Sequence, residues 1–172
     1  IYLMKQTKVI IFIFLIALAV CDNWAVLVAG SHTWANYRHQ ADVYHAYQVL
    51  IKGGFDANRI ITLAYNDLAN HLTNPFKGKV YNKPTYKDPG VDVYAGVSID
   101  YEKLHVTPAV YQAVLGGNYS FVNGKGSGRV VESTSADNIF IFFSDHGAPG
   151  LIAFPHENLY ADHLLATFAK MQ

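Results

Sequence analysis

The hydrophobic positions of the chain fall into short apolar runs separated by stretches of mixed polarity. Three runs are almost wholly apolar: 24–29 (WAVLVA), 60–65 (IITLAY) and 138–143 (NIFIFF). Runs of this length, rich in β-branched and aromatic residues, are typical of strands that a parallel sheet buries on both faces. We therefore expect strands at these three positions.

Residues 40–52 follow a helical period instead. The predicted apolar face of this helix consists of Val43, Tyr44, Tyr47, Leu50 and Ile51. The opposite face carries Asp42, His45 and Lys52, and Gly53-Gly54 is a stop signal at the C-terminal end. A strand, a helix and a second strand at this spacing predict a βαβ unit.

Two further helices are expected, at 108–115 and 160–171. Thr107 followed by Pro108 marks the start of the first, because threonine caps helix amides and proline is favoured at the first helical position. The predicted loops are 66–92, 116–137 and the segment that follows His146. Strands that alternate with helices predict an α/β fold with a mostly parallel sheet and helices on both of its faces.

The first 21 residues have the parts of a secretory signal peptide. Lys5 and Lys8 precede a 12-residue apolar run from Val9 to Val20, and small residues suited to cleavage follow. This run is shorter than the roughly 18 residues of a membrane-spanning helix. We expect a signal peptide at 1–21 and a mature domain at 22–172. The alternatives are an uncleaved membrane anchor and a lipoprotein signal ending at Cys21.

Composition narrows the classes of function. Acidic and basic residues number 13 each, and removal of Lys5 and Lys8 would leave 11 basic residues. A nucleic-acid surface needs a basic excess, so we expect no nucleic-acid partner. Cys21 is the one cysteine, so the expected mature domain has no disulfide, no thiolate metal site and no thiol nucleophile.

Polar residues at the ends of two predicted strands are candidates for chemistry, because sites in open α/β sheets form beyond the carboxyl ends of strands. Gly30-Ser31 follows the first strand, and Ser144-Asp145-His146-Gly147 follows the third. His146 can act as a general base near neutral pH. Gly147 lets the backbone approach a substrate, so its amide can stabilise an oxyanion. The alternative for His146 is a loop histidine satisfied by water.

Other motifs carry weaker signals. In the stretch 36–39, Asn36 can simply cap a helix and Arg38 can be a surface charge. The GKGSG run at 124–128 lacks the strand before and the helix after that a phosphate loop requires, so we interpret it as a loop. The histidines show no helical ligand pair with an intervening acid, so no metal site is predicted. Asn118-Tyr119-Ser120 is a glycosylation sequon.

Four ordered motifs resemble the legumain family of asparaginyl endopeptidases, also called vacuolar processing enzymes. They are NWAVLVAGS at 23–31, NYRHQADVYHAY at 36–47, DVYAGV at 92–97 and IFIFFSDHGAPG at 139–150. The resemblance runs from Asn23 to the end of the chain. It implies a caspase-like α/β fold, a cysteine–histidine site that cleaves proteins after asparagine and less readily after aspartate, and no metal or organic cofactor.

The same resemblance implies roles for individual residues. His146 matches the catalytic histidine, Gly147 a donor to the oxyanion hole, and Asn36 the residue that orients the histidine. Arg38 and His39 match the pocket for the substrate asparagine side chain.

Four positions add detail to the resemblance. Asp145 matches an aspartate linked in this family to peptide ligation. His32-Thr33 replaces a more usual Asn-Gly, and Tyr44 stands where relatives often have cysteine. The nucleophile motif is absent, and we expect it on a further strand after Gln172, because a helix at 160–171 should lead into one.

Two alternatives stay open at this point. The first is the catalytic subunit of a GPI-anchor transamidase, and the second is a noncatalytic caspase-fold binding protein. For the legumain reading we expect protein or peptide substrates, no membrane span in the mature chain, and a location in the secretory pathway, in lysosomes or vacuoles or outside the cell. The pattern does not predict an oligomeric state.

Overall fold

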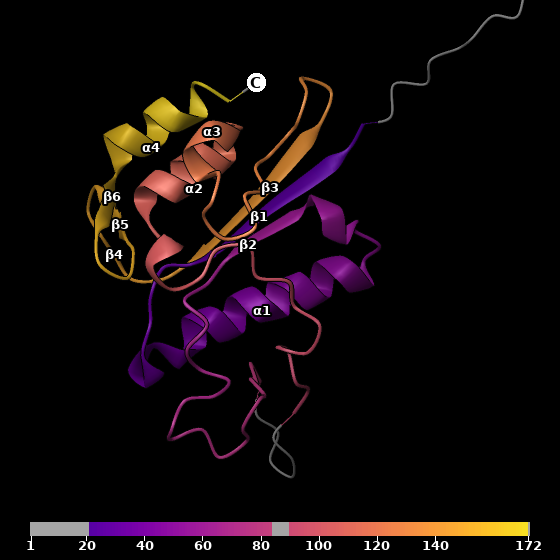
Figure 1. Ribbon diagram of the computed structural model, residues 1–172, viewed down its shortest axis with the longest axis vertical. Coiled ribbons are helices and arrows are strands. Elements are labelled where there is room, and N and C mark those ends of the chain that lie inside the picture. The colour runs from indigo at the N-terminus through magenta and orange to yellow at the C-terminus, as the bar shows by residue number, and fades with distance from the viewer. Residues whose placement is uncertain (1–20, 84–89, 172) are drawn as a thin grey trace, which may run out of the picture.

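Three parallel strands form the centre of the molecule, in the order β2-β1-β3 (Figure 1). The computed structural model describes residues 21–83 and 90–171, so most of the predicted signal peptide lies outside the described residues. Strand β1 (Asn23–Ala29) pairs with β2 (Ile60–Leu63) on one side and with β3 (Asn138–Ser144) on the other. As its continuous apolar sequence predicts, β1 is buried from Trp24 to Ala29.

Helix α1 (Tyr37–Lys52) covers one face of this sheet (Figure 1). Alternate residues of β1, among them Ala25 and Leu27, pack with Val43 and Tyr44 of the helix. The helix starts three residues before the predicted boundary. The prediction for Ile51 was wrong, because this residue is 37% exposed in the last turn of the helix.

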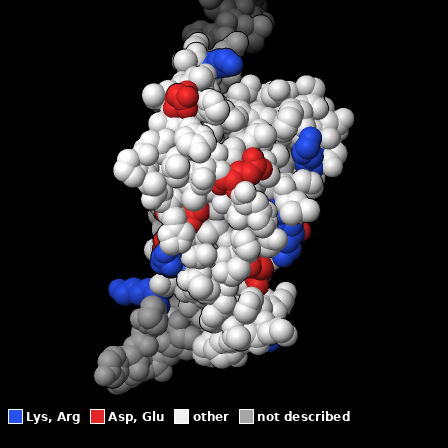
Figure 2. All heavy atoms as spheres, turned by 90° about the vertical axis from the view of Figure 1, so that its left-hand side faces the viewer, with Lys and Arg blue, Asp and Glu red and all other residues white. Residues whose placement is uncertain are grey.

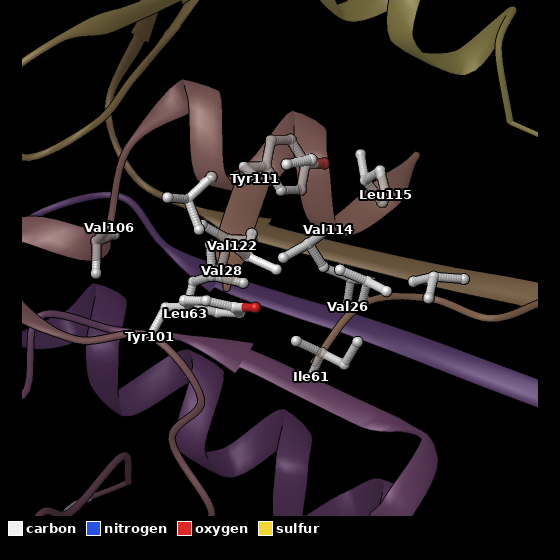
Figure 3. Packing of buried hydrophobic residues seen from close by; sticks show 14 of the residues in the cluster. Val26, Val28, Ile61, Leu63, Tyr101, Val106, Tyr111, Val114, Leu115 and Val122 are labelled. Atoms are coloured by element: carbon white, nitrogen blue, oxygen red, sulfur yellow. The ribbon is translucent and has the colours of Figure 1, made fainter. Parts of the chain in front are cut away.

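The opposite face is covered by α2 (Pro108–Leu115) and α3 (Tyr119–Val122) (Figure 1). Val26 and Val28 point to this side and pack with Tyr111 and Val114 of α2, as Figure 3 shows. The Thr107 side chain accepts a hydrogen bond from the Val110 amide at 3.2 Å, which confirms the predicted cap. Helices therefore cover both faces, and the predicted α/β fold class is confirmed.

Two predicted loops contain regular structure. Helix α3 lies inside 116–137, where a four-residue helix has too few residues to show a hydrophobic period. After His146, three strands form an antiparallel sheet in the order β4-β5-β6. They are β4 (Gly147–Ala148), β5 (Leu151–Ala153) and β6 (Asn158–Tyr160). These strands are two or three residues long, too short for an alternating pattern to emerge.

The remaining helices of the described residues are short. Helix α4 (Ala161–Phe168) packs beside α2, and three short 3₁₀ helices are η1 (Trp34–Asn36), η2 (Ala57–Arg59) and η3 (Lys103–His105). As predicted, the described parts of 66–92 form an irregular loop. One isolated β-bridge joins Tyr81 to Asp92. Among residues 21–83 and 90–171, none of the helices has the length and hydrophobicity needed to cross a membrane.

Candidate functional site

The candidate site lies where β1 and β3 end side by side. Ala29 is in register with Ser144, and the Gly30 amide donates to the Ser144 carbonyl at 3.2 Å. Because the strands are parallel, the residues that follow both of them leave the sheet at the same rim. The two polar strand ends predicted from the sequence are therefore brought together.

His146 and Asn36 form a hydrogen bond at this rim. Asn36 Oδ1 lies 2.9 Å from His146 Nε2, and Asn36 Nδ2 donates to the His32 carbonyl at 3.0 Å. A carbonyl only accepts, so the amide group of Asn36 must turn its NH₂ toward His32 and its oxygen toward His146. His146 Nε2 therefore carries the proton and donates it to Asn36, and Nδ1 keeps a free lone pair.

This contact also decides between two readings of Asn36. The residue stands at the N-cap position of α1, but its side chain makes no capping hydrogen bond to that helix. The interpretation of Asn36 as a simple helix cap is therefore wrong.

Behind His146, three polar side chains form a second cluster. Ser31 Oγ lies 2.6 Å from His39 Nδ1, and Asp145 Oδ1 lies 2.9 Å from the same nitrogen. The Asp145 side chain is 1% exposed, and its Oδ1 makes no hydrogen bond within the described residues. Asp145 therefore lies close to His39 Nδ1 without a hydrogen bond, and Ser31 Oγ is the hydrogen-bond partner of that nitrogen. The His39 ring also meets that of His146 edge to face, with centroids 4.8 Å apart.

Burial sets the charge of this second cluster. Burial lowers the pKa of His39 below its ordinary value, the neighbouring Arg38 lowers that pKa further, and Asp145 acts in the opposite direction. The net shift favours the neutral imidazole. Neutral His39 can accept a hydrogen bond at one nitrogen while it donates at the other.

Gly30 makes room for the buried carboxylate. A Cβ atom built at this position would lie 2.3 Å from the Ala153 carbonyl oxygen and 2.7 Å from Asp145 Oδ2. Any larger residue would therefore displace either the backbone of β5 or the side chain of Asp145. The glycine at the end of β1 is therefore required by this close approach.

His39 and Asp145 of this cluster, together with His146, also offer atoms of the kind that bind metals. His39, Asp145 and His146 each offer a ligand atom, and these atoms lie within 4.8 Å of one another. An imidazole pair with a carboxylate is a donor set that transition metals accept. The same set also suits acid–base chemistry, and the prediction that no metal is needed stays a prediction.

The other predicted site residues lie around this rim or away from it. Arg38 is exposed next to His39, and its Nη1 donates to the Ala35 carbonyl at 3.4 Å. Gly147 is exposed and opens β4 directly after His146. Asn118 lies elsewhere, at the start of α3, where its Oδ1 accepts from Ser120 Oγ at 2.8 Å.

From the sequence, Ser31 was a polar strand-end candidate without an assigned role, and His32 was not a site candidate. Ser31 holds His39, and the carbonyl of His32 holds Asn36. Ser31 carried a detectable signal, since it is a polar residue directly after a buried strand. His32 carried none, because its contact with Asn36 is made by its backbone carbonyl.

Comparisons with known proteins agree with the motifs. The model of the Peptidase C13 family matches residues 23–172. Legumain of Rattus norvegicus is 46% identical over 149 residues, which are 87% of this chain and 33% of that protein. The vacuolar-processing enzyme beta-isozyme of Arabidopsis thaliana is 49% identical over 149 residues, 86% of this chain and 30% of its own.

A third relative shows the same coverage. Hemoglobinase of Schistosoma mansoni is 49% identical over 150 residues, 86% of this chain and 33% of that protein. The chain thus spans about a third of the length of the curated relatives it matches.

Proposed function

The chain belongs to the peptidase C13 family, and we propose that the complete protein is a cysteine endopeptidase that cleaves protein substrates after asparagine and less readily after aspartate. The observation that carries the proposal is the hydrogen bond between Asn36 and His146 at the carboxyl rim of the sheet. It prepares one imidazole nitrogen as a base in an exposed position that a substrate can reach.

His146 is the general base and acid of the proposed reaction. Its Nδ1 takes the proton of a cysteine thiol, and the thiolate attacks the carbonyl carbon of the asparagine residue. The protonated ring then returns that proton to the leaving amine. Water attacks the acyl-enzyme in the second half of the cycle, again with His146 as the base. Asn36 orients the ring throughout.

The attacking thiol is not Cys21. This cysteine lies before the start of β1, and its Sγ accepts from Asn138 Nδ2 at the start of β3. His146 lies past the far end of the same strands, and seven residues of strand span about 23 Å.

We propose instead that the thiol follows Gln172, on a strand that pairs with β3. Within the described residues the outer edge of β3 has no partner strand, and Phe140 on β3 is 47% exposed. Leu165 of α4 is 65% exposed, as expected for a helix whose apolar face lacks a covering layer.

Substrate recognition is assigned to the residues beside the catalytic pair. The Arg38 guanidinium can donate to the carbonyl oxygen of an asparagine side chain. Neutral His39 can accept from its NH₂ group. The Gly147 amide is proposed to donate to the oxyanion, together with other backbone N–H groups at the carboxyl rim of the sheet. A pocket built for a primary amide rejects other side chains strongly, because they leave buried polar groups unpaired.

Asp145 is proposed to influence the balance between hydrolysis and peptide ligation. The Asp145 side chain is buried, and a carboxylate oxygen lies within 4.8 Å of a ring nitrogen of His146, so its charge acts on the group that moves the proton. The proposed reaction takes protein or peptide substrates and uses no cofactor.

The proposed location is the secretory pathway, in lysosomes or vacuoles or outside the cell. This location is supported by the signal-peptide pattern at 1–21 and by the similarity to a vacuolar-processing enzyme of Arabidopsis thaliana. Asn118 is proposed to carry an N-glycan, because this residue is exposed. Its side chain caps α3 through Oδ1, which leaves Nδ2 for attachment of the sugar. On the face shown in Figure 2, lysines and arginines are scattered among acids without forming a basic patch.

The relatives favour neither alternative function. The three relatives reported above are a legumain, a vacuolar-processing enzyme and a hemoglobinase, and none of these three is named as a transamidase subunit. We therefore carry the endopeptidase proposal alone.

The test uses the complete protein and a pair of fluorogenic peptides that differ only in asparagine or glutamine before the cleaved bond. The asparagine peptide should be cleaved and the glutamine peptide should not, and pretreatment with iodoacetamide should stop the reaction. Equal cleavage of both peptides would refute the specificity. Activity that survives alkylation would refute the cysteine mechanism.

A further inference from the structure

The turn that joins β1 to α1 contains a strained residue beside the proposed catalytic pair. Thr33 has φ 75° and ψ 157°, a conformation that glycine adopts readily and that β-branched residues avoid. Strain of this kind persists only where surrounding contacts hold it in place. The residues that maintain this conformation of Thr33 therefore contribute to the function of the turn.

Two residues of the segment after β2 supply such contacts. The Asp67 carboxylate accepts from the Thr33 amide at 2.7 Å through Oδ2 and from Gln40 Nε2 at 2.7 Å through Oδ1. The ring of Tyr65 stacks on the ring of His32, with centroids 4.7 Å apart and 28° between their planes. The turn is thus held from outside at two successive residues.

The His32-Thr33 turn in its turn positions Asn36. The carbonyl of His32 accepts from Asn36 Nδ2 at 3.0 Å, and the carbonyl of Thr33 accepts from the Asn36 backbone amide at 3.1 Å. The oxygen of the same side chain faces His146 Nε2. A movement of the turn therefore reaches His146 through two hydrogen bonds.

We propose that Tyr65 and Asp67 are positioning residues of the catalytic site. They hold the His32-Thr33 turn in a glycine-like conformation, so that Asn36 fixes the tautomer of His146. This inference rests on the proposed function, because it concerns the efficiency of the same histidine. It predicts one result that a general stabilising role of Tyr65 and Asp67 does not predict. The need for Tyr65 and Asp67 arises from the strain at Thr33, so it should largely disappear when Thr33 is replaced by glycine.

The test compares kcat and KM of variants of the complete protein on one asparagine peptide. Tyr65→Ala and Asp67→Ala should each lower kcat about tenfold and change KM by less than about twofold, since a small displacement of a catalytic group acts on turnover. Tyr65→Phe keeps the stacked ring and should retain most of the activity.

Adding Thr33→Gly to either alanine variant should restore most of the lost kcat, because coupled residues give non-additive effects. Equal losses with and without Thr33→Gly would overturn the proposal.

A second measurement separates this inference from the proposed function. In the complete protein labelled with ¹⁵N-histidine, the ring nitrogen shifts of His146 report which nitrogen carries the proton. Tyr65→Ala and Asp67→Ala should shift His146 toward a mixture of tautomers, and Thr33→Gly should reverse the shift. If these shifts move as expected in a protein that cleaves no asparagine peptide, the positioning role holds and the proposed function is wrong. If they do not move, the positioning role is wrong at any level of activity.

Discussion

Asn36 and His146 are 110 positions apart in the chain, yet Asn36 Oδ1 lies 2.9 Å from His146 Nε2. The parallel register of β1 and β3 brings them together, because the segments that follow both strands leave the sheet at one rim. The two residues are not equivalent in the proposed reaction. His146 exchanges a proton with the thiol and the leaving group, whereas Asn36 only orients the ring.

Substitutions at these two positions should therefore differ in severity. In the complete protein, His146→Ala should lower kcat/KM for an asparagine peptide by on the order of a thousandfold or more, because no other group moves the proton. Asn36→Ala should lower it by at most about a hundredfold, since the ring is displaced but still present. Steady-state kinetics on one peptide measures both. Near wild-type turnover in His146→Ala would show that the base has been assigned to the wrong residue.

A second prediction concerns the space at Gly30. Gly30→Ala should destabilise the protein by roughly 1–3 kcal/mol, because the added methyl group meets the Ala153 carbonyl at 2.3 Å and the Asp145 side chain at 2.7 Å. The midpoint of urea unfolding measures the effect. Gly53→Ala is the matched control, since its nearest neighbour would lie 3.2 Å away and its φ of −75° suits alanine. A loss at Gly30 no larger than at Gly53 would contradict the packing argument.

The sequence predicts those parts of the fold that depend on local pattern. The burial of β1 follows from its unbroken apolar run, and the start of α2 follows from Thr107 and Pro108. The position of His146 at a strand end was also predictable, because five apolar residues lead up to Ser144 and Asp145. These features require only neighbours in the chain.

The parts that could not be predicted depend on distant neighbours. Strands β4 to β6 are too short to carry a period and form only because the segment folds back on itself after His146. The contact of Ser31 with His39 requires α1 to lie at one particular depth against the sheet. The burial of the Asp145 side chain likewise depends on the absence of a side chain at Gly30, a relation that no local motif contains.

The third prediction concerns stability and pH. The pKa of His39 in the folded protein is lowered from its ordinary 6.5, chiefly by burial. As pH falls through about 6.5, the unfolded chain therefore takes up a proton at this histidine before the folded protein does. Stability from His39 is present above that pH and is lost as the pH falls below it.

His39→Gln removes this titration, so the stability of the variant should fall less steeply than that of the wild type between about pH 7 and pH 5. Urea unfolding of the complete protein at several pH values measures the slope. Identical slopes in the variant and the wild type would show that His39 binds protons equally in the folded and unfolded states.

The last prediction concerns Arg38 and substrate recognition. Among the described residues its guanidinium pairs with no carboxylate, and one nitrogen donates to the Ala35 carbonyl at 3.4 Å. Most of its donors are therefore free to bind a substrate side chain at the rim that carries His146.

Arg38→Ala should lower kcat/KM for the asparagine peptide by about tenfold to a hundredfold, the range expected when a hydrogen bond to a charged group is lost. The rate at which iodoacetamide alkylates the catalytic thiol should change little, because Arg38 does not activate the thiol. Arg59→Ala is the matched control: Arg59 pairs with Asp22 at the opposite end of the sheet, so its removal should leave kcat/KM unaffected. If Arg38→Ala left kcat/KM unchanged, the recognition role would be refuted. If it slowed alkylation as much as cleavage, Arg38 would act on the thiol and not on the substrate side chain.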